Sequence, residues 1–103
     1  MEKKTPHYDL SVIQADVARL GAAAFTRTAL VSGRHLGLSL REMQQVIAGL
    51  QCKMLYKSMT TYLDHRIWQD VYCTHIDAAE LYIKVTYRPG GGPPVISFKE
   101  KHP

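Results

Sequence analysis

The chain has 103 residues, enough for a single domain spanning 1–103 with one modest hydrophobic core. Its hydrophobic content of 46% and charged content of 21% are those of a folded protein and exclude wholesale disorder. The 13 Lys and Arg residues against 9 Asp and Glu give a net charge of +4, which weakly favours an acidic partner such as a nucleic acid.

Nothing in the sequence suggests insertion into a membrane or export. No uninterrupted apolar stretch approaches the roughly 18 residues that span a bilayer, and the charged start is not followed directly by the apolar segment of a secretory signal. We therefore expect a cytoplasmic protein. In that compartment Cys52 and Cys73 favour free thiols over a disulfide. Cys73-Thr74-His75 also lacks the second ligand pair of a structural zinc site.

Helical periodicity marks the first half of the chain. A first helix is predicted to end at Gly21, with Thr5 as its N-cap and Pro6 at its first position, where a missing N–H costs nothing. Its apolar residues recur at a 3-4-3 spacing that places them on one face: Leu10, Ile13, Val17 and Leu20. A second, shorter helix is predicted over about residues 28–36 and is stopped by Gly37.

A third helix begins at a capping box, in which Ser39 and Glu42 each satisfy a free backbone donor of the first turn. Its apolar residues repeat the 3-4-3 spacing and are predicted to lie in the core: Leu40, Met43, Ile47 and Leu50.

After residue 53 the periodicity changes to two, which indicates strands. Residues 60–62 favour one strand, and apolar and polar residues alternate in two more, at 81–86 and 96–99. The Gly- and Pro-rich segment 88–94 between them is predicted to be a flexible hairpin loop. Helices followed by such strands predict an α+β domain, with the N-terminal helices packed on one face of a C-terminal antiparallel sheet.

A functional site is predicted on the sheet face that the helices leave uncovered. The alternation predicts these inward residues: Leu81, Ile83, Val85, Ile96 and Phe98. Tyr82 and Lys84 then point outward, as does Lys99 on the neighbouring strand, and Lys57 on an earlier strand can join them. Ammonium groups neutralise phosphates, and a tyrosine stacks on a base or holds a proton. This set therefore suits a bound phosphodiester.

The same residues also admit a plainer interpretation. Lysines on the wet face of a sheet are commonly just solvated, and a strand tyrosine commonly packs with its hydroxyl at the rim. Gln69 alternates with Ile67 and Val71, which predicts that it faces the core or begins a strand after a bend. Trp68 is expected to anchor packing rather than to stack on a base.

Other chemistries find little support in the sequence. The chain has no GxxxxGK[ST], GxSxG or HExxH motif. Its five histidines are scattered, and the carboxylates of the second half make a weak case for a metal-dependent nuclease. Neither a metal nor a cofactor is therefore expected.

Several blocks of the sequence match one known family in order and at similar spacing. The most specific are YKSMTTY at 56–62, Asp64-His65, IWQDVY at 67–72 and the SFKEK ending at 97–101. Further matches are Met1 to His7, Leu36-Gly37-Leu38, Val46-Ile47, Gly49-Leu50, and Tyr82 with Lys84. With these blocks the chain resembles the MqsR family, the toxins of a bacterial toxin–antitoxin pair.

The resemblance implies a RelE-like α+β fold and the toxin of a type II toxin–antitoxin system. Such a toxin is a ribosome-independent, metal-independent endoribonuclease that cleaves mRNA at GC-containing sites such as GCU and so inhibits translation and growth. The positions that match the family's active site are Lys57, Gln69 and Tyr82, with Lys99 and the outward-facing Lys84 as phosphate-binding candidates. The implied partner is an MqsA-like antitoxin, a DNA-binding protein that holds the zinc itself, so the toxin reaches DNA only through the antitoxin.

In a metal-free reaction the neighbouring 2′-hydroxyl attacks the phosphate and leaves a 2′,3′-cyclic phosphate and a free 5′-hydroxyl. Lys57 and Lys99 are assigned to the phosphate, and Tyr82 to proton donation or to holding the nucleotide. Gln69 is assigned to orienting the phosphate or hydroxyl through its amide.

Two alternatives stay open at the level of the sequence. His7 and His65 are other candidates for carrying the proton. A non-enzymatic regulator or adaptor that binds DNA or protein is the competing hypothesis, because the second and third helices meet across Gly37-Leu38-Ser39 somewhat as in a helix-turn-helix.

Overall fold

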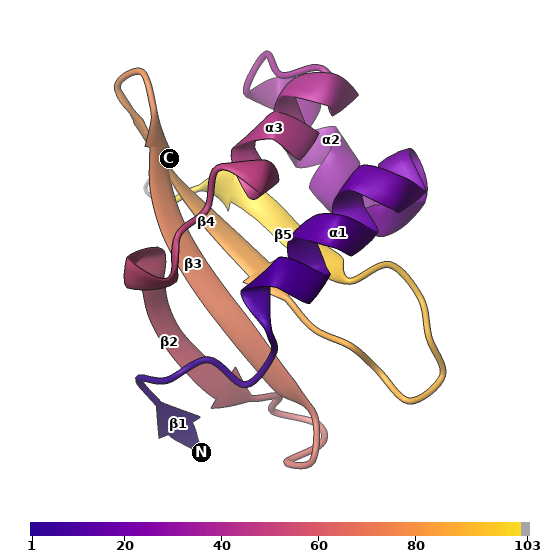
Figure 1. Cartoon of the computed structure of the whole chain (residues 1–103), viewed down its shortest axis with the longest axis vertical. Helices are drawn as coiled ribbons and strands as arrows, with labels where there is room; N and C mark the ends of the chain where they lie inside the picture. Colours follow the sequence, from indigo (N-terminus) through magenta and orange to yellow (C-terminus); the bar gives the residue numbers. More distant parts are fainter. Residues whose placement is uncertain (102–103) are drawn as a thin grey trace.

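The structure is a computed structural model that describes residues 1–101, in which helices cover one face of a single sheet (Figure 1). The helices are α1 (Leu10–Leu20), α2 (Arg27–His35) and α3 (Leu40–Ala48), with 3-10 turns at Gly21–Ala24 and Cys52–Met54. The strands are β1 (Glu2–Lys3), β2 (Leu55–Thr60), β3 (Trp68–Ile76), β4 (Ala79–Val85) and β5 (Val95–Glu100). No helix within residues 1–101 is both long and apolar enough to span a membrane.

The sheet is antiparallel throughout, and its strands lie in the order β1-β2-β3-β4-β5. The predicted α+β arrangement is therefore confirmed. The Gly- and Pro-rich loop does connect the last two strands, over residues 86–94. The short strand β1 was not predicted; it pairs Glu2 with Met59 and forms one edge of the sheet.

Helix α1 begins later than the sequence suggested. Its N-cap is Asp9, whose carboxylate accepts the backbone N–H of Ser11 at 2.9 Å. The prediction that Thr5 caps the helix, with Pro6 at its first position, was therefore wrong. The predicted end at Gly21 is confirmed: this residue has a φ of 61°, which glycine adopts without strain.

The extended start of the chain is explained by bonds to a buried carboxylate. Asp70 of β3 is fully buried and accepts the backbone N–H groups of His7 and Tyr8 at 3.0 and 2.8 Å. The Ser58 hydroxyl of β2 donates to the same carboxylate at 2.6 Å. These tertiary hydrogen bonds hold the segment before α1 against the sheet and prevent it from continuing the helix.

The other two helices follow their sequence signals. Both hydrogen bonds of the predicted capping box are present, the Ser39 backbone N–H donating to Glu42 at 2.9 Å and the Glu42 N–H donating to Ser39 at 3.1 Å. Gly37 has a φ of 82° just after α2. Met43 and Ile47 are buried as predicted, whereas Leu40 is only half-buried.

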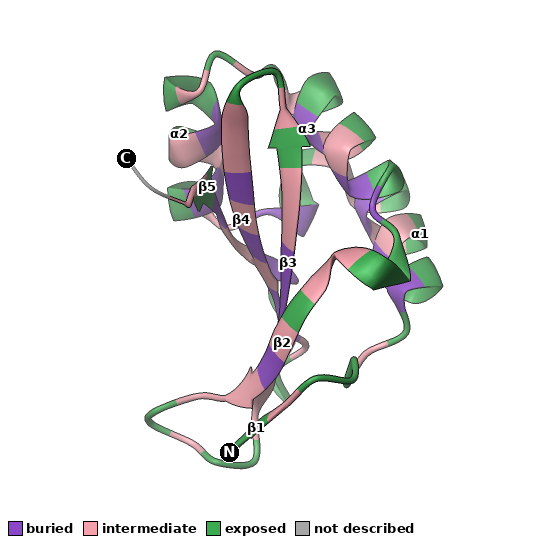
Figure 2. Cartoon of the chain, turned by 90° about the vertical axis from the view of Figure 1, so that its left-hand side faces the viewer, coloured by how far each residue is buried: buried purple, intermediate pink, exposed green. Residues whose placement is uncertain are grey.

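The hydrophobic core fills the space between helices and sheet, where Figure 2 shows the inner stripes of the helices and the middle of the strands as buried. The predicted inward positions Leu81, Ile83 and Val85 of β4 are fully buried there. Phe98 of β5 is buried as well, but Ile96 is not. The register shifts between Lys84 and Val85, so simple alternation fails at Ile96 and Val95 takes the core position.

Candidate functional site

Basic and aromatic side chains lie beside one another on the sheet face away from the helices. Tyr82 of β4 pairs with Lys99 of β5, while Val71 of β3 lies in register between Lys57 of β2 and Lys84 of β4. We call Lys57, Tyr82, Lys84 and Lys99 the basic face. The prediction that these four side chains share one face of the sheet is confirmed by the strand register, whereas their roles stay a prediction.

Gln69 lies on this face too, as the second residue of β3 after the turn at residues 61–67, so the alternative that it begins a strand after a bend fits and the core-facing alternative was wrong. The core-facing alternative rested on the apolar Val71, two residues further on. Val71 is fully buried, yet it lies between Lys57 and Lys84 and does not belong to the core cluster. Cross-strand neighbours on one face have Cβ atoms within about 5.5 Å, so the aliphatic stems of the two lysines shield it. Gln69, two residues before Val71 on the same side of β3, is half-buried at the end of the basic face.

The lysines of the basic face influence one another electrostatically. Burial lowers the pKa of the Lys84 ammonium, and the positive charges of Lys99 and Lys57 lower it further. The same ammonium lies 5.6 Å from the centre of the Tyr82 ring, within range of a cation–π contact. A bound phosphate would relieve this mutual repulsion, so the arrangement favours an anionic ligand.

The tyrosine at the centre of the face is kept in its protonated form. Burial raises the pKa of the Tyr82 phenol above its ordinary value, and this outweighs the opposing effect of Lys57. Its ring packs edge-on against Tyr56, with ring centres 6.3 Å apart. At neutral pH the hydroxyl can therefore donate a proton or a hydrogen bond, and it is a poor base.

Lys57 is held by a carboxylate from the edge of the sheet. Its Nζ lies 3.2 Å from Oε1 of Glu2 in β1. The hydrogen bond to Glu2 raises the pKa of Lys57, so its ammonium stays charged well beyond neutral pH. Glu2 thus occupies one side of a cation that a phosphate would otherwise contact.

Lys99 lies on the outer strand of the sheet and is exposed. It borders a hollow of about 290 Å³ against α2, together with Ser32 and His35. Lys99 therefore forms the outer rim of the basic face, while Lys57 and Lys84 lie nearer its middle.

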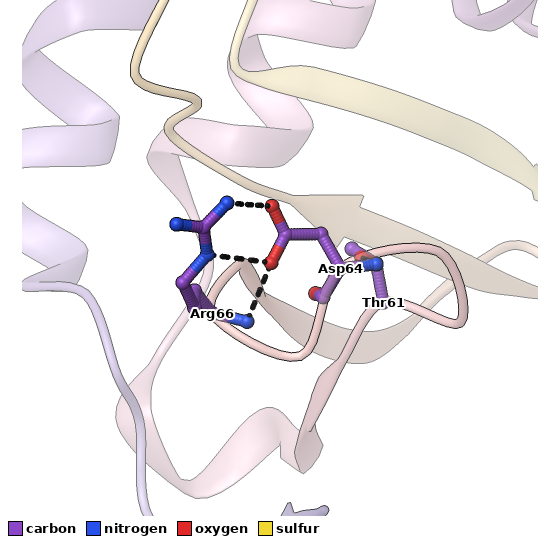
Figure 3. A network of polar contacts seen from close by, with 3 residues as sticks. All are labelled: Thr61, Asp64 and Arg66. Atoms are coloured by element: carbon purple, nitrogen blue, oxygen red, sulfur yellow. Dashed lines mark hydrogen bonds and ion pairs between the residues drawn. The ribbon is translucent and has the colours of Figure 1, made fainter.

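The segment between β2 and β3 turns over the Gln69 end of the basic face. Thr61 Oγ1 donates to the Asp64 carbonyl at 2.7 Å and accepts the Asp64 N–H at 3.0 Å. The Asp64 carboxylate in turn accepts hydrogen bonds from Nε and Nη2 of Arg66, both at 3.1 Å (Figure 3). His65, one of the two alternative proton carriers, lines a hollow here with Gln69.

His7, the other alternative, is engaged in a packed cluster at the edge of the sheet. Its ring stacks on Trp68 at 5.2 Å between centres with an interplanar angle of 12°. Lys3 Nζ lies 3.2 Å from His7 Nδ1 and 4.3 Å from the centre of the Trp68 ring. The expectation that Trp68 anchors packing agrees with these contacts.

The helix pair that resembles a helix-turn-helix presents few groups for reading bases. Gln44 of α3 uses its side-chain amide to donate to the Val17 carbonyl of α1 at 3.1 Å. Arg41, Gln45 and Ala48 of α3 are exposed. A single cation among them makes this surface a weaker candidate than the basic face for binding nucleic acid.

Two residues beside the basic face, Tyr56 and Lys101, were not predicted from the sequence. The register shifts between Leu55 and Lys57, and Tyr56 contacts Tyr82 of the basic face despite its position next to Lys57. The ammonium groups of Lys57 and Lys101 lie 5.4 and 4.9 Å from the centre of the Tyr56 ring. The only sequence feature that indicated a contact between Tyr56 and the basic face is its position next to Lys57.

Cys52 and Cys73 are free thiols, and burial raises the pKa of Cys73. Within residues 1–101 no group of three or more His, Cys, Asp or Glu side chains is placed to hold a metal ion.

Fold and site together define a small α+β protein with a cationic, tyrosine-containing sheet face. Residues 5–100 match the sequence model of the family described as motility quorum-sensing regulator, toxin of MqsA. The mRNA interferase toxin MqsR of Escherichia coli (strain K12) is 44% identical over 101 residues, which cover 98% of this chain and 100% of that relative. The chain therefore belongs to the MqsR toxin family, and the resemblance found in the sequence is confirmed.

Proposed function

We propose that this protein is an endoribonuclease toxin that cleaves mRNA without the ribosome, at GC-containing sites such as GCU, and thereby inhibits translation and growth. One observation carries the proposal: the strand register brings Lys57, Lys84 and Lys99 together around the protonated Tyr82 on one open sheet face. The relative from Escherichia coli is named an mRNA interferase toxin, which supports the same activity here.

The proposed reaction is attack of the 2′-hydroxyl on the adjacent phosphorus. The 2′-hydroxyl loses its proton to solvent as the bond forms, and the bond to the 5′-oxygen breaks. Tyr82 donates its phenolic proton to that oxygen and regains one from solvent, so the products are a 2′,3′-cyclic phosphate and a 5′-hydroxyl. Lys57 and Lys84 stabilise the charge on the phosphate, with Lys99 holding a neighbouring one. Gln69, at the end of the face, orients the nucleotide.

The positive charge in this scheme comes from lysine ammonium groups, so no metal ion or cofactor is required. Cleavage of a purified transcript in EDTA and without ribosomes tests this directly. If the RNA stays intact at high protein concentration, the enzymatic proposal fails and a non-enzymatic nucleic-acid-binding regulator takes its place.

The decisive variant is Tyr82→Phe, which removes the proton donor and keeps the ring. We expect single-turnover cleavage of a defined transcript to slow by about 10²- to 10⁴-fold, the usual contribution of proton transfer. Tyr87→Phe is the matched control, because it removes a hydroxyl that donates to Asp16 of α1 at 2.7 Å, on the helix side. Cleavage by Tyr82→Phe at the parent's rate would rule out Tyr82 as the acid.

The partner we propose is an MqsA-like antitoxin that carries zinc and binds DNA, so that the toxin contacts DNA only within the complex. The family description, toxin of MqsA, supports this pairing. Co-expression of the two proteins should give a complex that elutes as one species in size-exclusion chromatography, with all zinc in the antitoxin. Separate elution of the two proteins would argue against the pairing.

We also propose that residues 1–103 act as one domain in the cytoplasm, where its mRNA substrate is found. Limited proteolysis that releases no stable smaller fragment is the expected result.

A further inference from the structure

The loop at the end of the basic face borders an open hollow of about 460 Å³. Its lining includes Met59, Tyr62, His65, Gln69 and Lys84. Lys84 belongs to the basic face as well, so the hollow and the face are continuous. A ligand held by Lys84 can therefore extend into the hollow.

Tyr62 stands at the rim of this hollow with almost its whole side chain in solvent. It is 95% exposed, although a tyrosine ring normally gains by burial. The loop that carries it is nevertheless fixed, because Thr61 and Asp64 exchange two hydrogen bonds and Asp64 pairs with Arg66 (Figure 3). The ring is thus presented to solvent by an ordered turn.

Gln69 contributes a polar side chain to the lining of the hollow. It lies two residues along β3 from Val71, which pairs with Lys84, and two residues of an antiparallel strand span about 6.8 Å. Its amide offers both donors and an acceptor, which is what the hydrogen-bonding edge of a base requires. Because the Gln69 amide and the edge of a base are both uncharged, a hydrogen bond between them requires no neutralisation of charge.

We propose that this hollow is a base-binding subsite for single-stranded RNA. One unstacked base enters it and stacks on the Tyr62 ring, the Gln69 amide hydrogen-bonds the edge of that base, and Lys84 holds the adjoining phosphate. Single-stranded RNA is recognised in this way, by bases splayed out onto aromatic side chains and read at their edges. The inference rests on the proposed function and makes Tyr62 a base-binding residue and Gln69 a specificity-determining one.

The test measures binding of a GCU-containing RNA oligonucleotide whose 2′-hydroxyls are methylated and so cannot attack the phosphate. Tyr62→Ala should raise its dissociation constant by about 5- to 150-fold, the range found for loss of one base–aromatic stack. Tyr62→Phe should bind like the parent, since it keeps the ring. Val31→Ala is the matched control, an exposed apolar side chain on α2, and should also bind like the parent.

A second set of oligonucleotides, each with one base removed, locates the contact. Removing the stacked base should weaken binding to the parent and have no further effect on Tyr62→Ala. If every single-base removal weakens both proteins equally, no base stacks on Tyr62 and the subsite is overturned.

Lys84→Ala separates this inference from the proposed function. If the parent does not bind the oligonucleotide, or Lys84→Ala binds as the parent does while retaining its thermal stability, RNA binding by the basic face is refuted. If Lys84→Ala weakens binding but Tyr62→Ala does not, the basic face stands and the base-binding subsite is refuted.

Discussion

At the scale of single residues, the neighbours across the sheet decide what each site residue does. Val71 looks like a core residue in the sequence, but it supports two lysines on the open face. Lys57 and Lys84 flank it and differ in their surroundings. Lys57 is paired with Glu2, whereas Lys84 is half-buried and faces other lysines. The two cations should therefore respond differently to the loss of a neighbouring charge.

Glu2→Gln tests the competition between carboxylate and phosphate for Lys57. We expect the variant to bind RNA up to about fivefold more tightly, since a solvent-exposed ion pair contributes at most about 1 kcal/mol. The pKa of Lys57 should fall, because the hydrogen bond to Glu2 is what raises it. Both quantities can be followed, by fluorescence anisotropy and by NMR titration of the lysine side chain.

The control is Glu42→Gln on α3, which removes one negative charge far from the site and keeps a side chain suited to the capping box. It should leave RNA affinity close to that of the parent. Weaker binding by Glu2→Gln would mean that Glu2 holds Lys57 in position and does not compete with RNA.

At the scale of secondary structure, the sequence predicted the helices better than the segments between them. The capping box and the glycine stops act within a few residues, so they can be recognised locally. The position of residues 1–9 depends on Asp70, which lies more than sixty residues away. The bulges next to Tyr56 and Ile96 depend on the partner strands in the same way. No local pattern encodes such contacts.

Asp70→Ala should show how strongly β3 holds the N-terminal segment. The substitution removes the acceptor for His7, Tyr8 and Ser58, and each unpaired buried donor costs about 1 to 3 kcal/mol. We expect the free energy of unfolding in urea to fall by about 3 kcal/mol. Glu80→Ala, which removes a partly exposed carboxylate, should lower it by less than about 1 kcal/mol. If Asp70→Ala lowered the free energy of unfolding by less than about 1 kcal/mol as well, water would be replacing the hydrogen bonds that Asp70 accepts.

At the scale of the whole molecule, the two faces of the sheet have different roles: one packs against the helices and the other carries the basic face. The helices cover one face of the sheet (Figures 1 and 2) and form the core together with it. The other face is left to carry the lysines. The sequence predicted this division and the shared face of Lys57, Tyr82, Lys84 and Lys99, because alternation holds along β4, over residues 97–99 of β5 and between Lys57 and the buried Ser58. For Gln69 it left two alternatives, and the core-facing one was wrong because an apolar neighbour does not always mark the core.

The salt dependence of RNA binding should report which face is used. Each lysine that neutralises a phosphate contributes about 0.7 to the slope of log affinity against log salt for a single strand. Lys84→Ala or Lys57→Ala should therefore reduce the slope by about 0.7 each. Arg41→Gln on α3 should leave it unchanged. The opposite result would favour the helix pair as the nucleic-acid-binding surface.

The buried Val71 beneath the lysines has a thermodynamic consequence. Lysine side chains ordinarily lose up to about 2 kcal/mol of conformational entropy when they are fixed by a ligand. Here the stems of Lys57 and Lys84 already pack on an apolar surface, so much of that freedom is lost when the protein folds. Val71→Ala should loosen both stems, and calorimetry should then show RNA binding with a more unfavourable entropy at an almost unchanged enthalpy.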